Sequence, residues 1–199
     1  FDKWLLSKLQ KVIRSSTTSF EKYEYSRTKA DVEKFFWQTF CDQYLEIVKD
    51  RLYNPTIRGG KGSSQQALYQ GILNVLKMMA PIMPHITEEV YQSYFGKDSI
   101  HTTPWPEYNE NLVDEKAELA GDIGVDIINV VRKWKSEQQM SLKDEISELV
   151  LVSEQDGFKE SIESIEADLK AVLKAGKISF TGSTTAESDK FSIQVGVVK

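Results

Sequence analysis

Residues 32–53, VEKFFWQTFCDQYLEIVKDRLY, contain the clearest helical pattern of the chain. Apolar side chains recur through this stretch at the three- and four-residue spacing of an amphipathic helix, and many of them are aromatic. The apolar stripe consists of Val32, Phe36, Phe40, Tyr44, Ile47 and Val48. Because aromatic side chains bury a large apolar area, we expect this helix to lie in the middle of a bundle. It should end near Tyr53, since the following Asn54-Pro55 step disfavours another helical turn.

Four more helices are expected from the same periodicity, over about residues 5–20, 63–79, 85–95 and 114–135. Ser63 and Gln66 have the spacing of a capping box at the start of the third helix of the chain. Pro81 and Pro84 should bracket a break before the fourth. Glu88 and Glu89 would then lie in its first turn, where carboxylates favour the positive end of the helix dipole. These two glutamates are therefore assigned to helix capping and structural pairing.

The pattern changes after about residue 142. Three stretches, 148–152, 178–180 and 190–198, have the composition of strands, and residues 162–173 are typical of a helix that stops at Gly176. The expected fold class is thus mainly α: a helical bundle over residues 1–142, followed by a small mixed α/β unit over residues 143–199.

Charge limits the kinds of partner. The chain has 199 residues and a formal net charge of -5, which argues against indiscriminate binding of polyanions. Any contact with nucleic acid must therefore be local. Candidate basic clusters are Lys49 with Arg51, Arg58 with Lys61, and Arg132, Lys133 and Lys135. Charge alone favours the plainer interpretation of these clusters as solvated helix faces.

Several kinds of site are disfavoured. The single cysteine, Cys41, cannot form an internal disulfide and is expected to be a buried, inert thiol in a reducing compartment. His85 and His101 are far apart and lack cysteines at finger-like spacing, so no metal site is expected. Lys61-Gly62-Ser63 has the wrong order for a phosphate loop. No membrane span, signal segment or catalytic constellation is expected.

Four segments, taken in order, resemble one family. They are residues 23–53, the run APIMPHITEEVY at 80–91, Ser99-Ile100-His101 followed by Trp105-Pro106, and VRKWKSE at 131–137. Together they resemble the anticodon-binding domain of the valyl-, isoleucyl- and leucyl-tRNA synthetases of class I. The sequence of the second helix and the Lys-Ser-Glu helix end most resemble those of valyl-tRNA synthetases. Membership of the isoleucyl-tRNA synthetases is the alternative.

The resemblance implies a longer parent enzyme that uses ATP and magnesium to attach valine to its tRNA in the cytoplasm. Its catalytic domain would lie upstream of Phe1, and the two class I signature motifs are absent from this chain. The segment Gln139-Met140-Ser141-Leu142-Lys143 has only a superficial similarity to the second signature motif. We therefore expect no catalytic residue and no cofactor in this chain. The implied partners are valine-specific tRNA and the catalytic domain, without DNA or membrane.

If the chain binds tRNA, the basic clusters are the candidate contacts. Proteins read RNA by stacking unpaired bases on aromatic or guanidinium planes, while Lys and Arg hold the phosphates. The hypothesis assigns Lys49, Arg51, Arg58 and Lys61 to the anticodon stem-loop, and Arg132, Lys133 and Lys135 to a second patch.

Alternatives remain for individual side chains and for the whole chain. In place of an RNA contact, Arg51 could pair with an acidic neighbour such as Glu46 or Asp50. Trp37 is expected in the core with Phe40 and Tyr44, rather than as a stacking platform for a base. A free-standing helical module that binds other proteins is the alternative from a different functional class.

Overall fold

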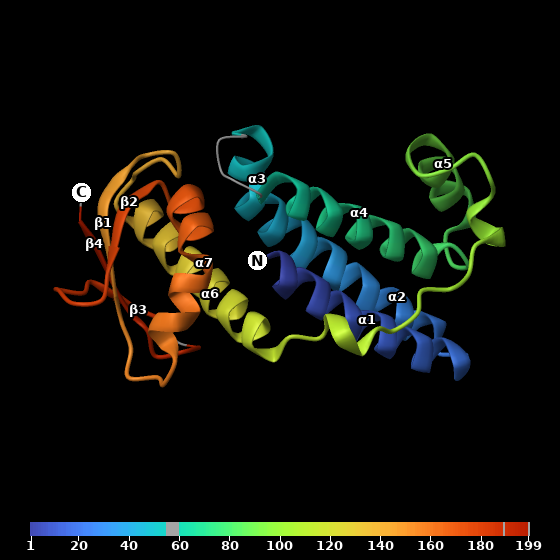
Figure 1. The fold of residues 1–199 in the computed structure, drawn as a ribbon, viewed down its shortest axis with the longest axis horizontal. Helices are drawn as coiled ribbons and strands as arrows, with labels where there is room; N and C mark the ends of the chain where they lie inside the picture. Colours follow the sequence, from blue (N-terminus) through green and yellow to red (C-terminus); the bar gives the residue numbers. More distant parts are fainter. Residues whose placement is uncertain (55–59, 189, 199) are drawn as a thin grey trace. The chain divides into compact units, whose positions relative to one another are not determined.

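The computed structural model describes residues 1–54, 60–188 and 190–198, which form two compact units (Figure 1). The helical unit contains Asp2–Leu45 and the described part of residues 55–114. The sheet unit contains Phe1, Glu46–Asn54 and the described part of residues 115–199. The expected class, mainly helical with a small α+β part at the C-terminus, is confirmed. The predicted boundary after residue 142 lies inside the sheet unit.

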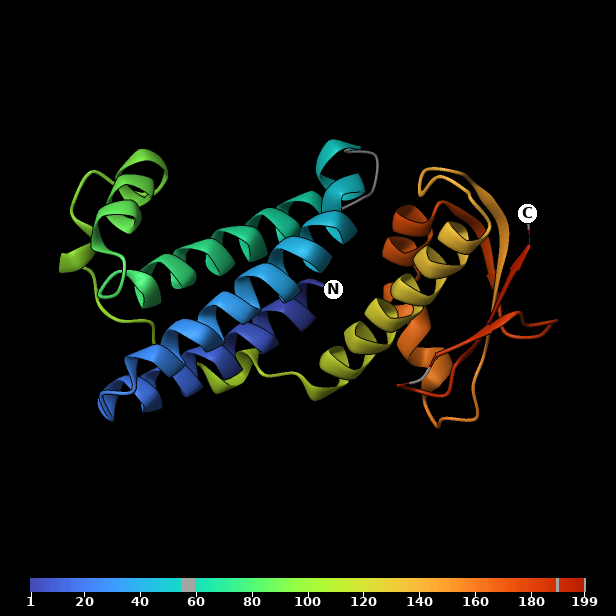
Figure 2. The same cartoon turned by 180° about the vertical axis from the view of Figure 1, so that it is seen from behind.

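The helical unit is built from long helices. Its elements are α1 (Asp2–Glu21), α2 (Tyr25–Lys34), the π-helix η1 (Phe35–Tyr44), α4 (Gly60–Met79), α5 (Pro84–Tyr94) and the 3-10 turns η2 (Ile100–Thr102) and η3 (Glu110–Leu112). Helix α1 packs along both α2 and α4, as Figures 1 and 2 show from opposite sides. Its buried stripe includes Leu5, Leu9 and Ile13. Among the described residues, no helix is both long and apolar enough to cross a bilayer.

The central helix departs from the predicted periodicity at η1. A π-helix is wound more widely than an α-helix, so its buried side falls on Phe35, Phe40 and Tyr44, at spacings of five and four. The burial predicted for Phe40 and Tyr44 is confirmed. That predicted for Trp37 is wrong: this side chain is 60% exposed, because the wider winding turns it outward. Phe36, predicted in the stripe, is only half-buried.

Helix α4 begins at Gly60, before the predicted capping box. Ser63 is already inside the helix, and its hydroxyl donates a hydrogen bond to the carboxylate of Asp2. The capping-box prediction is therefore wrong.

Helix α5 begins at Pro84, which places Glu88 beyond the first turn. The Glu88 carboxylate accepts hydrogen bonds from the Ile100 backbone N–H at 2.9 Å and from the Ser99 hydroxyl at 3.0 Å. Glu88 therefore stabilises the start of η2, and within its own helix it accepts a hydrogen bond from the Gln92 side chain at 2.7 Å. Its predicted structural role is confirmed, but at a different helix end.

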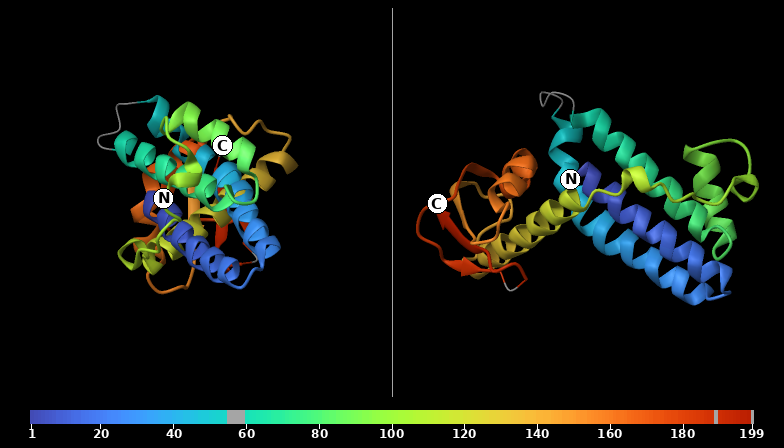
Figure 3. Two further views of the ribbon diagram at one scale, coloured as in Figure 1. Left: turned by 90° about the vertical axis from the view of Figure 1, so that its right-hand side faces the viewer. Right: turned by 60° about the horizontal axis from the view of Figure 1, so that its bottom comes forward.

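The sheet unit combines helices with a four-stranded sheet. Its elements are most of α3 (Leu45–Tyr53), α6 (Glu115–Glu137), β1 (Ile146–Val152), α7 (Phe158–Leu173), β2 (Ala175–Ser179), β3 (Ala186–Glu187) and β4 (Gln194–Val198). The strand order is β2-β1-β4-β3, with β1 and β2 parallel and the other pairs antiparallel. Strand β3 was not predicted. Helices α6 and α7 pack together and against the sheet (Figure 3). Their buried apolar side chains form the core.

Candidate nucleic-acid interface

Two of the predicted basic clusters meet at one cavity of the sheet unit, which we call the α3–α7 groove. Its volume is about 470 Å³. The walls come from α3, from the last turns of α6 and α7, and from the turn that follows α6. The lining residues are Glu46, Ile47, Lys49, Asp50, Tyr53, Asn54, Arg132, Lys135, Leu142, Lys143, Ala171, Val172, Leu173 and Lys174. Five of these side chains are cationic and two are anionic, so the groove favours an anion.

Four of the five cations lie at the surface of the groove. The Lys49 ammonium is 2.7 Å from the Glu46 carboxylate, but both side chains are about half exposed. Such surface pairs contribute only about 0–1 kcal/mol, so Lys49 can exchange this partner for a phosphate. Arg132 is half-buried and has no ion pair or hydrogen bond with another side chain in the described part of the chain. Lys143 and Lys174 are exposed.

Lys135 lies at the bottom of the groove and is 1% exposed. Its ammonium donates hydrogen bonds to the carbonyls of Leu142 (3.3 Å), Asp144 (2.6 Å) and Leu173 (3.0 Å). Burial lowers the pKa of Lys135, while the negative charge of Asp144 acts in the opposite direction. Because a lysine has three donors, all of them are used by the backbone. The structure therefore gives Lys135 a structural role, joining the turn after α6 to the end of α7.

Arg51 also faces inward. Its Nε is 2.9 Å from a carboxylate oxygen of Asp168 on α7, and the side chains of the two residues are 11% and 10% exposed. The alternative prediction, that Arg51 pairs with an acidic residue, is thus confirmed, but the partner is Asp168 and neither Glu46 nor Asp50. This ion pair connects α3 to α7, so Arg51 supports the wall of the groove.

The remaining predicted residues lie elsewhere. Lys133 is exposed next to Arg132 but does not line the groove. Lys61 is exposed in the first turn of α4, in the helical unit. Arg58 lies outside the described residues. The assignment of these three side chains to RNA contacts stays a prediction.

Three groove residues were missed by the sequence reasoning. Tyr53 is 77% exposed although it is a large aromatic side chain, and it lines the groove. Lys143 and Lys174 reach the same cavity from positions 31 residues apart in the chain. The sequence offered one signal for a role of Tyr53 in binding: it is an aromatic residue at the end of the helix that carries Lys49 and Arg51. Nothing in the sequence connected the two lysines.

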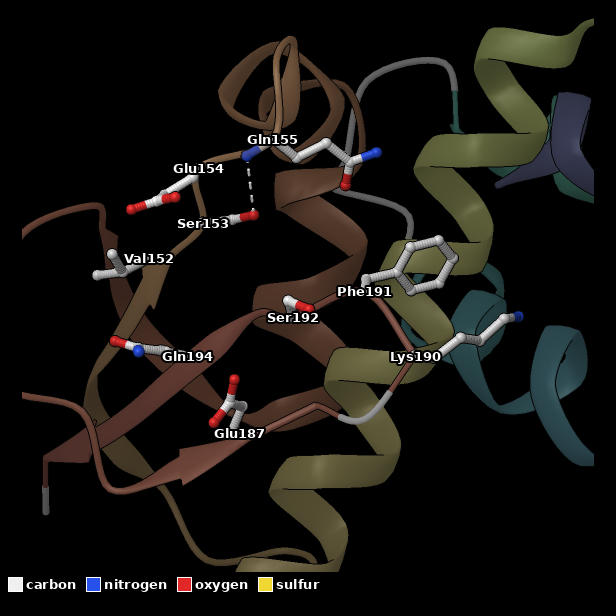
Figure 4. Close-up of a pocket in the computed structure, with 9 residues that line it drawn as sticks. All are labelled: Val152, Ser153, Glu154, Gln155, Glu187, Lys190, Phe191, Ser192 and Gln194. Atoms are coloured by element: carbon white, nitrogen blue, oxygen red, sulfur yellow. Dashed lines mark hydrogen bonds between the residues drawn. The ribbon is translucent and has the colours of Figure 1, made fainter.

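A second cavity of the sheet unit, with a volume of about 560 Å³, has a different chemistry (Figure 4). Its charged side chains are Glu154, Glu187 and Lys190. The Ser153 hydroxyl is already used, since it accepts a hydrogen bond from the Gln155 backbone N–H at 3.2 Å. Two carboxylates against one lysine disfavour a phosphate ligand. The α3–α7 groove is therefore the better candidate for RNA.

Comparison with known proteins gives a family for this arrangement. Residues 2–151 match the family described as the anticodon-binding domain of tRNA ligase. The chain belongs to this family. The matched residues of this anticodon-binding domain include α3, α6 and the turn after α6, which supply most of the groove. The end of α7, with Lys174, lies beyond them.

Individual relatives extend the similarity over nearly the whole chain. The valine--tRNA ligase of Ehrlichia ruminantium (strain Welgevonden) is 41% identical over 196 residues, covering 98% of this chain and 24% of the relative. The valine--tRNA ligase of Wolbachia pipientis wMel is 35% identical over 197 residues, covering 98% and 22%. That of Pyrococcus furiosus is 32% identical over 181 residues, covering 89% and 20%. The chain thus spans about a quarter or less of the length of these relatives.

Proposed function

We propose that the chain is the tRNA-binding region of a valine--tRNA ligase, and that its α3–α7 groove holds the backbone of the anticodon stem-loop. The family match and the names of the relatives support the first part. The second part is carried by one observation: five cationic side chains and the exposed Tyr53 converge on one cavity of a chain with a net charge of -5.

The residues of the groove have distinct proposed roles. Arg132, Lys143 and Lys174 contact phosphates, and Arg132 can do so with two parallel hydrogen bonds. Tyr53 offers a flat, exposed face on which an unpaired base stacks, which is worth roughly 1–3 kcal/mol per base. Arg51 and Lys135 act indirectly, because they fix the helices that carry these side chains.

Attachment of valine to its tRNA would be the work of a separate catalytic domain of the longer protein, in the cytoplasm. ATP and magnesium would bind to that domain. Within the described ranges of this chain, no three His, Cys, Asp or Glu side chains come together as a metal site would require. The proposed contribution of this chain is recognition and positioning of the tRNA.

The groove is tested by reversing two of its charges. The double variant Arg132→Glu, Lys143→Glu should bind a valine tRNA transcript about 10- to 100-fold more weakly than the wild-type chain, since two phosphate contacts become repulsive. The slope of log affinity against log salt should become shallower by about 2. Fluorescence anisotropy at several salt concentrations measures both quantities. The matched control is Lys116→Glu, an exposed residue of α6 outside the groove.

Two results would contradict the proposal. An unchanged affinity of the double variant would remove the groove from the RNA contact. Equal affinity of the wild-type chain for valine and isoleucine tRNA transcripts would contradict the valine assignment.

A further inference from the structure

A second basic cavity lies in the helical unit, at the surface of α1 and at the start of α2. Its volume is about 330 Å³, and we call it the α1 groove. The charged residues that line it are Lys11, Arg14, Lys22, Glu24 and Arg27. All five are exposed. None of them is among the residues that the sequence pattern assigned to RNA.

The spacing of these residues makes a continuous stripe. Lys11, Arg14 and Thr18 follow one another at intervals of three and four, so they share one face of α1, and Lys22 comes directly after the end of this helix. At 1.5 Å per residue the helical part of the stripe is roughly 10 Å long. Arg27 adds a fourth cation from α2, which runs beside α1 in Figures 1 and 2. Together these four cations can contact successive phosphates of a nucleic-acid strand.

Most of the charged side chains that line the cavity are cationic. Glu24 is the one carboxylate that lines the cavity, and it lies 3.5 Å from Arg27 in an exposed pair. Four cations therefore face one anion, in a chain whose total charge is negative. The helix dipole does not explain the stripe, because its effect is confined to the last turn and α1 has no basic residue there.

Arg14 is held in place for binding. Its guanidinium lies 5.5 Å from the centre of the Tyr108 ring, in a cation–π contact. This contact orients the planar group without neutralising its charge. A guanidinium held in this way presents its donors in the fixed fork that suits a phosphate.

We propose that the α1 groove is a second surface for the ribose-phosphate backbone of RNA, separate from the α3–α7 groove. The inference rests on the proposed function, because it takes the ligand to be a tRNA. Contacts to phosphates position a nucleic acid without reading its sequence. The α1 groove therefore contributes affinity and orientation, and leaves specificity to other surfaces.

The test compares two triple variants of the chain. Lys11→Glu, Arg14→Glu, Lys22→Glu reverses the stripe. Lys34→Glu, Lys97→Glu, Lys116→Glu makes the same change in net charge at exposed sites outside both grooves. Affinities for a valine tRNA transcript and for an unrelated tRNA are measured over a range of salt. The groove variant should bind both RNAs at least about 10-fold more weakly than the control variant, with a salt slope shallower by about 2 to 3.

Three other outcomes would contradict the proposed role of the α1 groove. Equal binding by the two triple variants overturns the α1 groove, while the Arg132 and Lys143 double variant still reports on the proposed function. A loss confined to valine tRNA also overturns it, because backbone contacts do not depend on sequence. Failure of the wild-type chain to bind either RNA overturns both proposals. If circular dichroism shows that the glutamate variant is unfolded, the glutamines at the same three positions must reduce the salt slope.

Discussion

The ammonium of Lys135 joins three segments of the sheet unit through a single atom. It binds carbonyls of the turn after α6 and of the last residue of α7. Helical periodicity placed the neighbouring Trp134 in the core and Lys135 at a basic surface. In the structure Trp134 is half-buried and Lys135 is fully buried. The three carbonyls come from positions 142–173 and could not be inferred from the residues around Lys135.

Replacement of Lys135 tests this role. Lys135→Met keeps the length of the side chain but leaves buried carbonyls without a donor, so the free energy of unfolding should fall by about 1–3 kcal/mol. Urea denaturation measures the change. The matched control is Lys133→Met, two residues away and exposed, which should alter stability by less than about 0.5 kcal/mol. Similar effects of the two changes would mean that the buried hydrogen bonds do not stabilise the fold.

At the scale of elements, the close approach of α4 to the central helix depends on one glycine. A Cβ at Gly71 would lie 2.5 Å from the ring of Phe40, which is 2% exposed. Gly62 belongs to the same helix, and a Cβ there would meet nothing within 4 Å. The two glycines therefore separate packing from helix propensity.

The prediction is that alanine has opposite effects at these positions. Gly71→Ala should lower the free energy of unfolding by about 1–2 kcal/mol, since overpacking against Phe40 outweighs the gain in propensity. Gly62→Ala should raise it by about 0.5 kcal/mol. Thermal denaturation of the two variants checks both signs. Stabilisation by Gly71→Ala would show that the ring of Phe40 moves aside at little cost.

Elements that depend on local patterns were predicted well. Repeated apolar spacing located α1, α4, α6 and α7, because a helix buries one face at a regular interval. The π-helix η1 was missed, since its wider winding leaves no distinct composition. Strand β3 was also missed, because two residues are too few for a periodic signal.

At the level of the whole molecule, the candidate site also could not be predicted from local sequence patterns alone. The clusters at residues 49–51 and 132–135 were found one at a time from charge and resemblance. Their convergence on the α3–α7 groove depends on the packing of α6 and α7, which no local pattern encodes. For this reason the sequence could not separate Arg132, at the surface of the groove, from Arg51 and Lys135, whose charged groups are bound within the fold.

Charge distribution also belongs to the whole molecule. The chain is acidic overall, yet the α3–α7 groove and the α1 groove both have an excess of cations. The sequence-based expectation was a local contact with nucleic acid, and we propose these two grooves for it. An acidic remainder would limit binding of unrelated polyanions.

Ultraviolet crosslinking of a valine tRNA transcript to the chain, followed by mapping of the crosslinked peptides, tests the placement of the RNA most directly. We expect adducts on the peptide that contains Tyr53, at the anticodon loop of the RNA, and their loss in the Arg132→Glu, Lys143→Glu variant. Crosslinks confined to peptides that contribute no residue to the α3–α7 groove would contradict it.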